Sequence, residues 1–378
     1  MIDLLRLHIV WDHQSTEGAR IAEQISCHFD GIGMERDGVA YRVPVRFSST
    51  PWVSETPLPR SIDFARARHN VIILLHDEEM YDHRFAWNSW VSNLREEIIK
   101  RGGEDIYVPF GSITGEKPLD KDANDCIQYQ RRNKWCELVN DDARDQRLLL
   151  LILICVREHL RKLAGKTQKE PIFVSHAKTD GDQSARAIVD FINTTKEGVP
   201  LETFYDATEL MPGENYEGRF NEEIARGTLL AIVSDVYESR PWCVFELTQA
   251  KRWRRPIVLA DIGGKRISRT YPYGANLPRV RVKPNPEDPS WIEPLLVETM
   301  SEGLRCDLFE QQASVASPNN TLVLTRPPEL FDIIHRDSLP DLIVYPDPPL
   351  GDIEAALVER ALAAVAPTTR LVTLGEIT

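Results

Sequence analysis

The sequence predicts an α/β protein with mainly parallel sheets and helices on both faces. Short continuous apolar runs of the kind that form strands covered on both sides recur along the chain, as in Leu-Leu-Ala-Ile-Val at 229–233. These runs alternate with segments whose apolar residues have helical spacing, such as 185–192. The connections are short and contain turn formers such as Pro212-Gly213. This alternation of strand and helix is typical of a parallel α/β sheet.

The elements of the central part can be assigned in order. Strands are predicted at 172–175, 201–206, 229–233 and 256–260, and helices at 185–192, at 216–226 and from Ser239 or Arg240 onward. Pro241 suits the first turn of that last helix, and the loop 207–216 turns at Pro212-Gly213.

The helix after the 229–233 strand carries the most informative pair of residues. Trp242 and Glu246 are four residues apart, so their side chains lie one above the other on one face of the helix. The helix follows the carboxyl end of a buried strand, which is the edge where open α/β sheets bind ligands. The spacing therefore places a carboxylate beside a flat aromatic side chain at a candidate ligand site.

Four motifs in this region together resemble the Toll/interleukin-1 receptor (TIR) domain family, in its bacterial branch. They are Phe173-Val-Ser-His with Asp180, Phe204-Tyr-Asp, Leu210-Met-Pro-Gly, and Ser-Arg-Pro-Trp-Cys-Val-Phe-Glu-Leu at 239–247. The resemblance covers roughly 170–300 and implies a flavodoxin-like TIR domain, which we place at 170–312.

The resemblance implies one of two activities. Many bacterial TIR domains cleave NAD+ at its nicotinamide–ribose bond or cyclise the product, and others only assemble with further TIR domains. In the cleaving members the functional carboxylate is the Glu four residues after the Trp, here Glu246. Such a carboxylate would stabilise the oxocarbenium-like ribose that forms as nicotinamide leaves. NAD+ is then the substrate, no cofactor or metal is expected, and the residues expected to contact it are Trp242, Phe204, Ser175, His176, Lys178 and Asp206.

Each of these residues also has a purely structural interpretation. Glu246 on an exposed helix face would simply be solvated, and Trp242 would pack under a neighbouring loop. His176 would make a loop-closing hydrogen bond, and Asp206 would form a turn. Cys243 is interpreted as a small buried hydrophobic residue rather than a nucleophile, because no base lies beside it in the sequence.

Composition bounds the partners and the compartment. The 378 residues carry a net charge of −13, which argues against extensive electrostatic binding to nucleic acid or to an anionic membrane. Six cysteines without a C-x-x-C pair indicate free thiols, and the amino terminus does not resemble a signal peptide, so we expect a cytoplasmic protein. The apolar run 148–155 is far below the ~20 residues of a membrane span and is predicted to be a buried helix. The basic run 251–255 complements the dipole at a helix end.

Residues 1–135 show a degenerate version of the same plan. Strands are predicted at 5–11, 41–47, 71–75 and 106–110 and a helix at 16–29, with Pro44 indicating an edge strand or a bulge. The residues four positions beyond Trp87 and Trp90 are Val91 and Leu94, neither of which is acidic. We therefore predict a TIR-like, non-catalytic α/β domain here, with a plain flavodoxin-like domain as the alternative.

The remaining segments connect and extend these domains. A helical linker at 136–169 contains a helix at 142–163, and a further helix is predicted at 291–310. The segment 313–378 is predicted to be a small α/β extension that packs on another domain. Its strands are expected at 321–325, 342–345 and 370–374 and its helices at 328–335 and 352–365.

The expected function is that of an NAD+ glycohydrolase or cyclase, a hydrolase of N-glycosyl bonds in bacterial anti-phage immunity. By the same resemblance we expect self-association through TIR domains, and a defence-system partner protein or a nucleotide as trigger. The alternatives are a non-enzymatic adaptor that acts by TIR–TIR assembly, and a sensor or accessory subunit of a defence pair.

Overall fold

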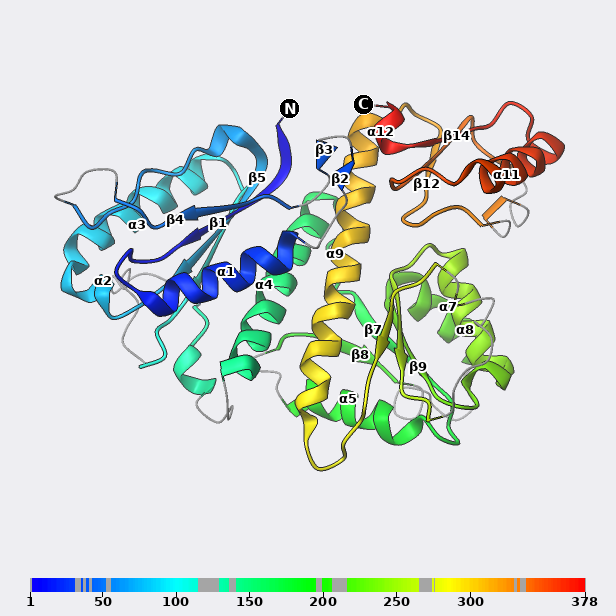
Figure 1. Cartoon of the computed structure of the whole chain (residues 1–378), viewed down its shortest axis with the longest axis horizontal. Coiled ribbons are helices and arrows are strands. Elements are labelled where there is room, and N and C mark those ends of the chain that lie inside the picture. Colours follow the sequence, from blue (N-terminus) through cyan, green and yellow to red (C-terminus); the bar gives the residue numbers. More distant parts are fainter. Residues whose placement is uncertain are drawn as a thin grey trace. The chain divides into compact units, whose positions relative to one another are not determined.

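The chain forms two compact units (Figure 1). Residues 1–35 and 40–159 make up the N-terminal unit, and residues 36–39 and 160–378 make up the C-terminal unit. The computed structural model describes residues 2–30, 35–36, 39–40, 43–51, 56–114, 129–135, 141–194, 199–205, 216–264, 274, 276–329, 332–333 and 338–377.

The N-terminal unit is built on a parallel sheet. Its strands are β1 (Asp3–Val10), β4 (Val45–Ser48), β5 (Ala67–Leu75) and β6 (Ile106–Phe110), in the spatial order β4-β1-β5-β6. In chain order this sheet reads 2-1-3-4, as in flavodoxin-like folds. The strand that follows Pro44 lies at the sheet edge, as predicted. The helices are α1 (Thr16–Asp30), α2 (Glu79–Asp82), α3 (Arg84–Lys100) and most of α4 (Asp141–Leu163). A separate two-stranded sheet pairs β2 (Glu35–Arg36) with β3 (Val39–Ala40).

Trp87 belongs to the core of this unit. Its ring is fully buried among β1, β5 and α3, and its indole N–H donates to Asp12 Oδ2 at 3.2 Å. Val91 and Leu94 lie on the same helix and belong to the same core cluster. The apolar residues at these two positions therefore serve packing.

The C-terminal unit contains a second parallel sheet with the same strand order. Its strands are β7 (Pro171–His176), β8 (Glu202–Phe204), β9 (Thr228–Val233), β10 (Ile257–Asp261) and β11 (Arg279–Arg281), in the order β11-β10-β9-β7-β8. In chain order this reads 2-1-3-4-5. The prediction of parallel α/β sheets is confirmed, while β11 was not predicted because Arg-Val-Arg is not an apolar run.

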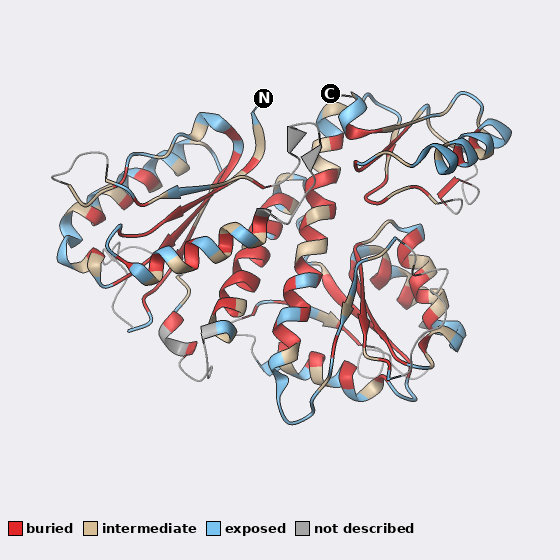
Figure 2. Cartoon of the chain, viewed as in Figure 1, coloured by how far each residue is buried: buried red, intermediate tan, exposed pale blue. Residues whose placement is uncertain are grey.

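The helices of this unit pack against the sheet. α7 (Tyr216–Arg226) and α8 (Pro241–Arg252) share one core cluster with alternate residues of β7, β9 and β10, so they cover one face. α5 (Asp182–Thr194) and α9 (Ile292–Ala316) lie on the other side of the strands (Figure 1). α8 begins at Pro241 with Arg240 as its N-cap, as predicted, and an unpredicted 3-10 turn at Tyr237–Ser239 precedes it. Figure 2 shows the buried residues gathered in the strands and along α9.

The carboxyl-terminal extension belongs to the C-terminal unit. It contains a parallel sheet of β12 (Thr321–Val323), β13 (Leu342–Tyr345) and β14 (Arg370–Thr373), with α11 (Asp352–Val365) and α12 (Leu374–Ile377). The three strands and the 352–365 helix are confirmed, although Leu374 begins a helix rather than ending a strand. Half of the residues of the predicted helix at 328–335 lie outside the described residues.

The long apolar run at 148–155 lies in α4 and is buried except for the partly exposed Cys155, as predicted. Among the helices in the described part of the chain, none is long and apolar enough to span a membrane.

The extension is joined to α8 by an ion pair. Lys251 Nζ donates to both carboxylate oxygens of Glu329 at 2.8 and 2.9 Å, and Arg326 Nη2 donates to the Lys251 carbonyl at 3.3 Å. Burial lowers the pKa of Lys251 and the Glu329 carboxylate partly offsets this. The basic run 251–255 therefore has tertiary partners in addition to its place at a helix end.

Glu329→Leu and Lys251→Met are expected to have unequal effects. Glu329→Leu leaves a buried ammonium without its carboxylate, which is expected to cost about 1–3 kcal/mol. Lys251→Met leaves the carboxylate, which is 21 % exposed and can be solvated, at an expected cost below about 1 kcal/mol. Hydrogen exchange of peptides from β12 to β14 measures both costs. Equal losses would contradict this account of the pair.

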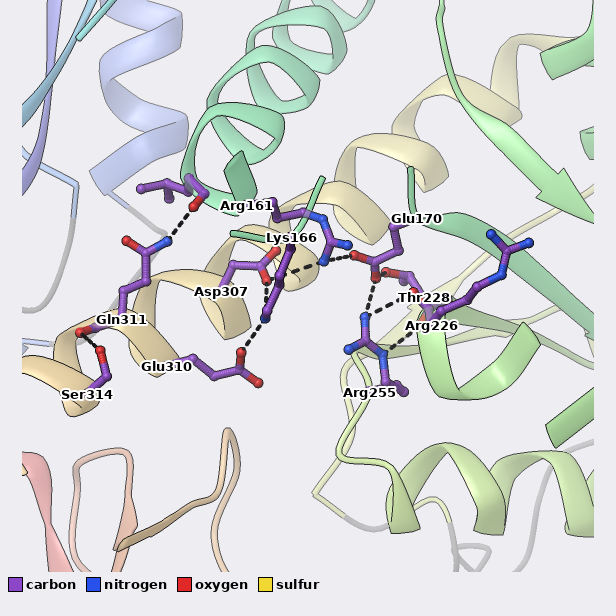
Figure 3. A network of polar contacts seen from close by, with 12 residues as sticks. Arg161, Lys166, Glu170, Arg226, Thr228, Arg255, Asp307, Glu310, Gln311 and Ser314 are labelled. Atoms are coloured by element: carbon purple, nitrogen blue, oxygen red, sulfur yellow. Dashed lines mark hydrogen bonds and ion pairs between the residues drawn. The ribbon is translucent and has the colours of Figure 1, made fainter. Parts of the chain in front are cut away.

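A network of charged residues surrounds the start of β7 (Figure 3). Glu170 forms ion pairs with Arg161 and with Arg255, and its Oε1 accepts a hydrogen bond from Thr228 Oγ1 at 2.6 Å. The Nη1 atom of Arg161 also lies 3.7 Å from Oδ1 of Asp307 on α9. The network thus connects the end of α4, the central strands and α9 within the C-terminal unit.

The N-terminal unit buries an unusual pair of titratable residues just after β5. The His76 ring is fully buried, and neither ring nitrogen has a hydrogen-bond partner among the described residues. Burial, and next the charge of Arg132, lower the pKa of His76 to about 3. Burial raises the pKa of the adjacent Asp77 to about 7. The His76 ring is therefore neutral at pH 7, and its burial lowers the free energy of unfolding of the N-terminal unit.

Replacing His76 with leucine is expected to raise the free energy of unfolding of the N-terminal unit by about 1–3 kcal/mol at pH 7. Because the folded pKa of His76 lies below the ordinary 6.5, the unfolded chain takes up this proton first, and the contribution of His76 to the stability of the wild-type fold falls as the pH drops below 6.5. The advantage of the variant should therefore grow by about 2 kcal/mol between pH 7 and pH 5. Urea unfolding at the two pH values measures this; a variant that is less stable at both would mean that the ring has a partner.

Candidate functional site at the carboxyl edge of the second sheet

Glu246 lies on the face of α8 that packs against the sheet. Its side chain is buried, with 7 % of the residue exposed, so the interpretation as a solvated surface residue is wrong. The carboxylate Oε2 accepts a hydrogen bond from Ser175 Oγ at 2.5 Å. Ser175 is the penultimate residue of β7, so the carboxylate is held at the carboxyl end of the strand that adjoins β9. The structure thus brings together two of the predicted site residues.

Tyr237 is a third member of this cluster and was not predicted. Its hydroxyl lies 2.7 Å from Ser175 Oγ, and its ring is fully buried in the core under α8. Ser175 therefore contacts both the carboxylate and the phenol. A tyrosine in the turn between a buried strand and a helix was the available signal, because a buried tyrosine hydroxyl usually finds a partner.

The loops around the cluster are tied together by Asp180. Its Oδ1 accepts a hydrogen bond from Ser234 Oγ at 2.5 Å and its Oδ2 accepts one from Val236 N at 3.2 Å. Arg240 Nη2, just before α8, donates to Thr179 Oγ1 at 2.7 Å. The loop after β7 is thereby fixed to the loop after β9, which positions the start of α8.

Trp242 shares α8 with Glu246 but is 43 % exposed. Its ring meets Phe220 edge-on at 6.2 Å and Phe245 edge-on at 5.4 Å between centroids. The indole therefore has packing contacts as well as an accessible surface, and both interpretations of Trp242 stay predictions.

His176 and Phe204, two further predicted site residues, pack against other aromatic rings. His176 follows Ser175 in β7 and points to the opposite face, where it stacks on Tyr205 at 5.2 Å. Its Nε2 lies 3.5 Å from Asp182 Oδ1, an ion-pair distance without hydrogen-bond geometry. Phe204 is buried in the core, stacked on Phe173 at 5.1 Å.

The two remaining predicted site residues are Lys178 and Asp206. Lys178 is exposed in the loop after β7. Asp206 and the loop to position 215 lie outside the described residues.

Cys243 packs beneath the same helix. Burial, and next the charge of Glu246, raise the pKa of its thiol to about 12, and its Sγ lies 3.4 Å from the His176 carbonyl oxygen. The interpretation of Cys243 as a buried hydrophobic residue agrees with this. The described residues contain no group of His, Cys, Asp and Glu side chains that could hold a metal ion.

The arrangement provides one buried carboxylate, oriented by a hydroxyl that is itself oriented by a phenol. Such a fixed carboxylate can accept hydrogen bonds from a bound ligand or stabilise positive charge that develops on it. Comparison with known proteins adds no family to this geometry. No protein-family model matches the chain, and no curated protein sequence matches it significantly.

Proposed function

We propose that the C-terminal unit cleaves NAD+ at its nicotinamide–ribose bond, with Glu246 as the catalytic carboxylate. The observation that carries the proposal is the short hydrogen bond between Ser175 Oγ and Glu246 Oε2 at the carboxyl edge of a parallel sheet. Ligands of open α/β sheets bind at that edge. The four sequence motifs that resemble TIR domains support the same assignment.

In the proposed reaction the nicotinamide leaves as a neutral base from a cationic pyridinium, so no strong general acid is required. The carboxylate of Glu246 would hold the ribose hydroxyls and stabilise the oxocarbenium-like ribose. Ser175 would fix the orientation of that carboxylate, and Tyr237 would fix Ser175. The accessible indole of Trp242 would pack on the pyridinium or the ribose. Water or the adenine ring would then capture the ribosyl cation.

The test is nicotinamide release from NAD+ by the full chain at concentrations that promote its assembly. Glu246→Gln keeps the shape and an acceptor for Ser175 but removes the negative charge, so turnover is expected to fall by about 10²–10³-fold or more. Glu354→Gln makes the same change on the exposed face of α11 and should leave turnover unchanged.

Two results would contradict the proposed cleavage of NAD+ at Glu246. Full turnover in Glu246→Gln would remove Glu246 from the mechanism. Assembly of the wild-type chain without any nicotinamide release would favour the non-enzymatic adaptor.

A further inference from the structure

A pocket of about 170 Å³ lies in the N-terminal unit, which the proposed reaction does not use. It is lined by the first turn of α1 with Ser15, by residues 75–79 at the end of β5, by residues 112–114 just after β6, and by Arg132. β1 and β5 are adjacent in the sheet, and the strand order reverses between them. The pocket therefore lies at the switch point where sheets of this topology bind ligands.

Two buried charged residues of the pocket are already held in place. Arg132 Nε donates to the Gly111 carbonyl at 2.7 Å and its Nη2 donates to the His76 carbonyl at 3.0 Å. Asp77 accepts hydrogen bonds from the backbone N–H groups of Asp12 at 3.1 Å and Met80 at 3.0 Å. Groups fixed in this way lose little entropy when they bind a ligand, which is typical of a preorganised site.

His76 supplies an independent indication of a ligand. It lines the pocket, its ring is wholly buried, and neither ring nitrogen has a partner among the described residues. Buried polar groups in folded proteins nearly always have partners, so a group without one calls for an explanation. The ring nitrogens are closed to solvent in the structure, so a ligand in the adjoining pocket would supply the missing partner once the ring turns toward it.

The size and chemistry of the pocket restrict the ligand. Its volume is close to that of the roughly 150 Å³ cavities that hold one benzene ring. Its described lining includes no Phe, Tyr or Trp side chain on which a nucleobase would stack, and the His76 ring is closed to solvent. Carboxyl groups at Glu17, Asp77, Glu78 and Glu79 outnumber the single guanidinium of Arg132, which disfavours a ligand with more than one anionic group.

We propose that this pocket binds a ribosyl or other monosaccharide group that carries at most one anionic substituent. The Asp77 carboxyl group and the glutamates accept hydrogen bonds from the sugar hydroxyls. The hydroxyl groups of Ser112 and Thr114, whose oxygens lie 2.9 Å apart, make further hydrogen bonds to the sugar. Arg132 and the first turn of α1 receive the single anion. The N-terminal unit is then a ligand-binding domain in its own right, whether or not the C-terminal unit cleaves NAD+.

The test uses the full chain and titration calorimetry with D-ribose, ribose 5-phosphate, inorganic phosphate and ATP as probes. Ribose 5-phosphate is expected to bind most tightly, ribose more weakly, and phosphate or ATP weakest. Ile113→Trp fills the mouth of the pocket from a position that is 40 % exposed, so the fold should persist while affinity falls at least about tenfold. Ile99→Trp, on an exposed face of α3 outside the pocket, is the matched control and should bind as wild type.

Thr114→Val replaces a hydroxyl with a methyl group at an exposed lining position and should lower the affinity for ribose 5-phosphate severalfold. The proposal is overturned if neither sugar binds at millimolar concentration, if phosphate alone binds as tightly as ribose 5-phosphate, or if Ile113→Trp binds like Ile99→Trp. Nicotinamide release is not part of this test, so its outcome is separate from that of the proposed reaction.

Discussion

Glu170→Ala is expected to lower the free energy of unfolding of the C-terminal unit by about 3–5 kcal/mol. The Glu170 side chain is only 4 % exposed, and it pairs with two guanidinium groups that are themselves 11 % and 14 % exposed, those of Arg161 and Arg255. Its removal leaves both cations buried with less compensation, and Thr228 Oγ1 loses its acceptor. Removing one member of a buried ion pair costs far more than the pair contributes, because the remaining charge stays desolvated.

The measurement is hydrogen exchange followed by mass spectrometry, because it reports peptides of each unit separately. Protection should fall in β7, β9 and β10 and stay unchanged in β1, β5 and β6. Glu202→Gln breaks an exposed ion pair with Lys169 at 3.4 Å and provides the matched control, with an expected cost below about 1 kcal/mol. A cost for Glu170→Ala as small as that of the control would show that the network contributes little.

Ser175→Ala is expected to lower kcat for nicotinamide release by about 10–100-fold with little change in KM. Ser175 Oγ contacts both the Glu246 carboxylate and the Tyr237 hydroxyl, so its loss frees the carboxylate without removing it. Ser175 is a positioning residue in this account. The prediction rests on the proposed reaction at Glu246.

Two further variants separate positioning from general stability. Ser175→Thr keeps the hydroxyl on a strand residue and should restore most of the rate. Tyr237→Phe keeps the buried ring and removes only the hydroxyl, so its effect should be smaller than that of Ser175→Ala. An alanine variant with wild-type kcat, or a threonine variant as slow as alanine, would contradict the positioning role.

Most elements of the fold could be predicted from the sequence because each carries a local pattern. The apolar run of β9 and the helical stripe of α5 gave boundaries within one or a few residues of those observed. β11 lacked such a pattern, since it is a short edge strand with exposed arginines that forms only because β10 offers a free edge. Pro241 marked the start of α8 correctly, while the 3-10 turn at Tyr237–Ser239 just before it was not predicted.

The candidate site was predictable in part. The four-residue spacing of Trp242 and Glu246 placed both on α8, but it could not show that Glu246 is buried while Trp242 keeps 43 % of its surface exposed. The pairing of Ser175 with Glu246 joins residues 71 positions apart, and no local pattern encodes it. The position of Tyr237 between a strand and a helix was a local signal for a buried tyrosine with a partner, but it could not identify Ser175 as that partner.

The sequence by itself determined the alternation of strands and helices, the parallel sheets and the helix that carries Glu246, because these follow from residue periodicity and turn chemistry along the chain. The tertiary structure alone decided which side chains meet. In a strand, neighbouring residues point to opposite faces of the sheet. Because α8 packs on one face of β7, Ser175 contacts the Glu246 carboxylate there, while His176 lies near Asp182 on the opposite face. Packing also left the His76 ring, beside the pocket of the first sheet, without a hydrogen-bond partner in the part of the chain that the structure describes.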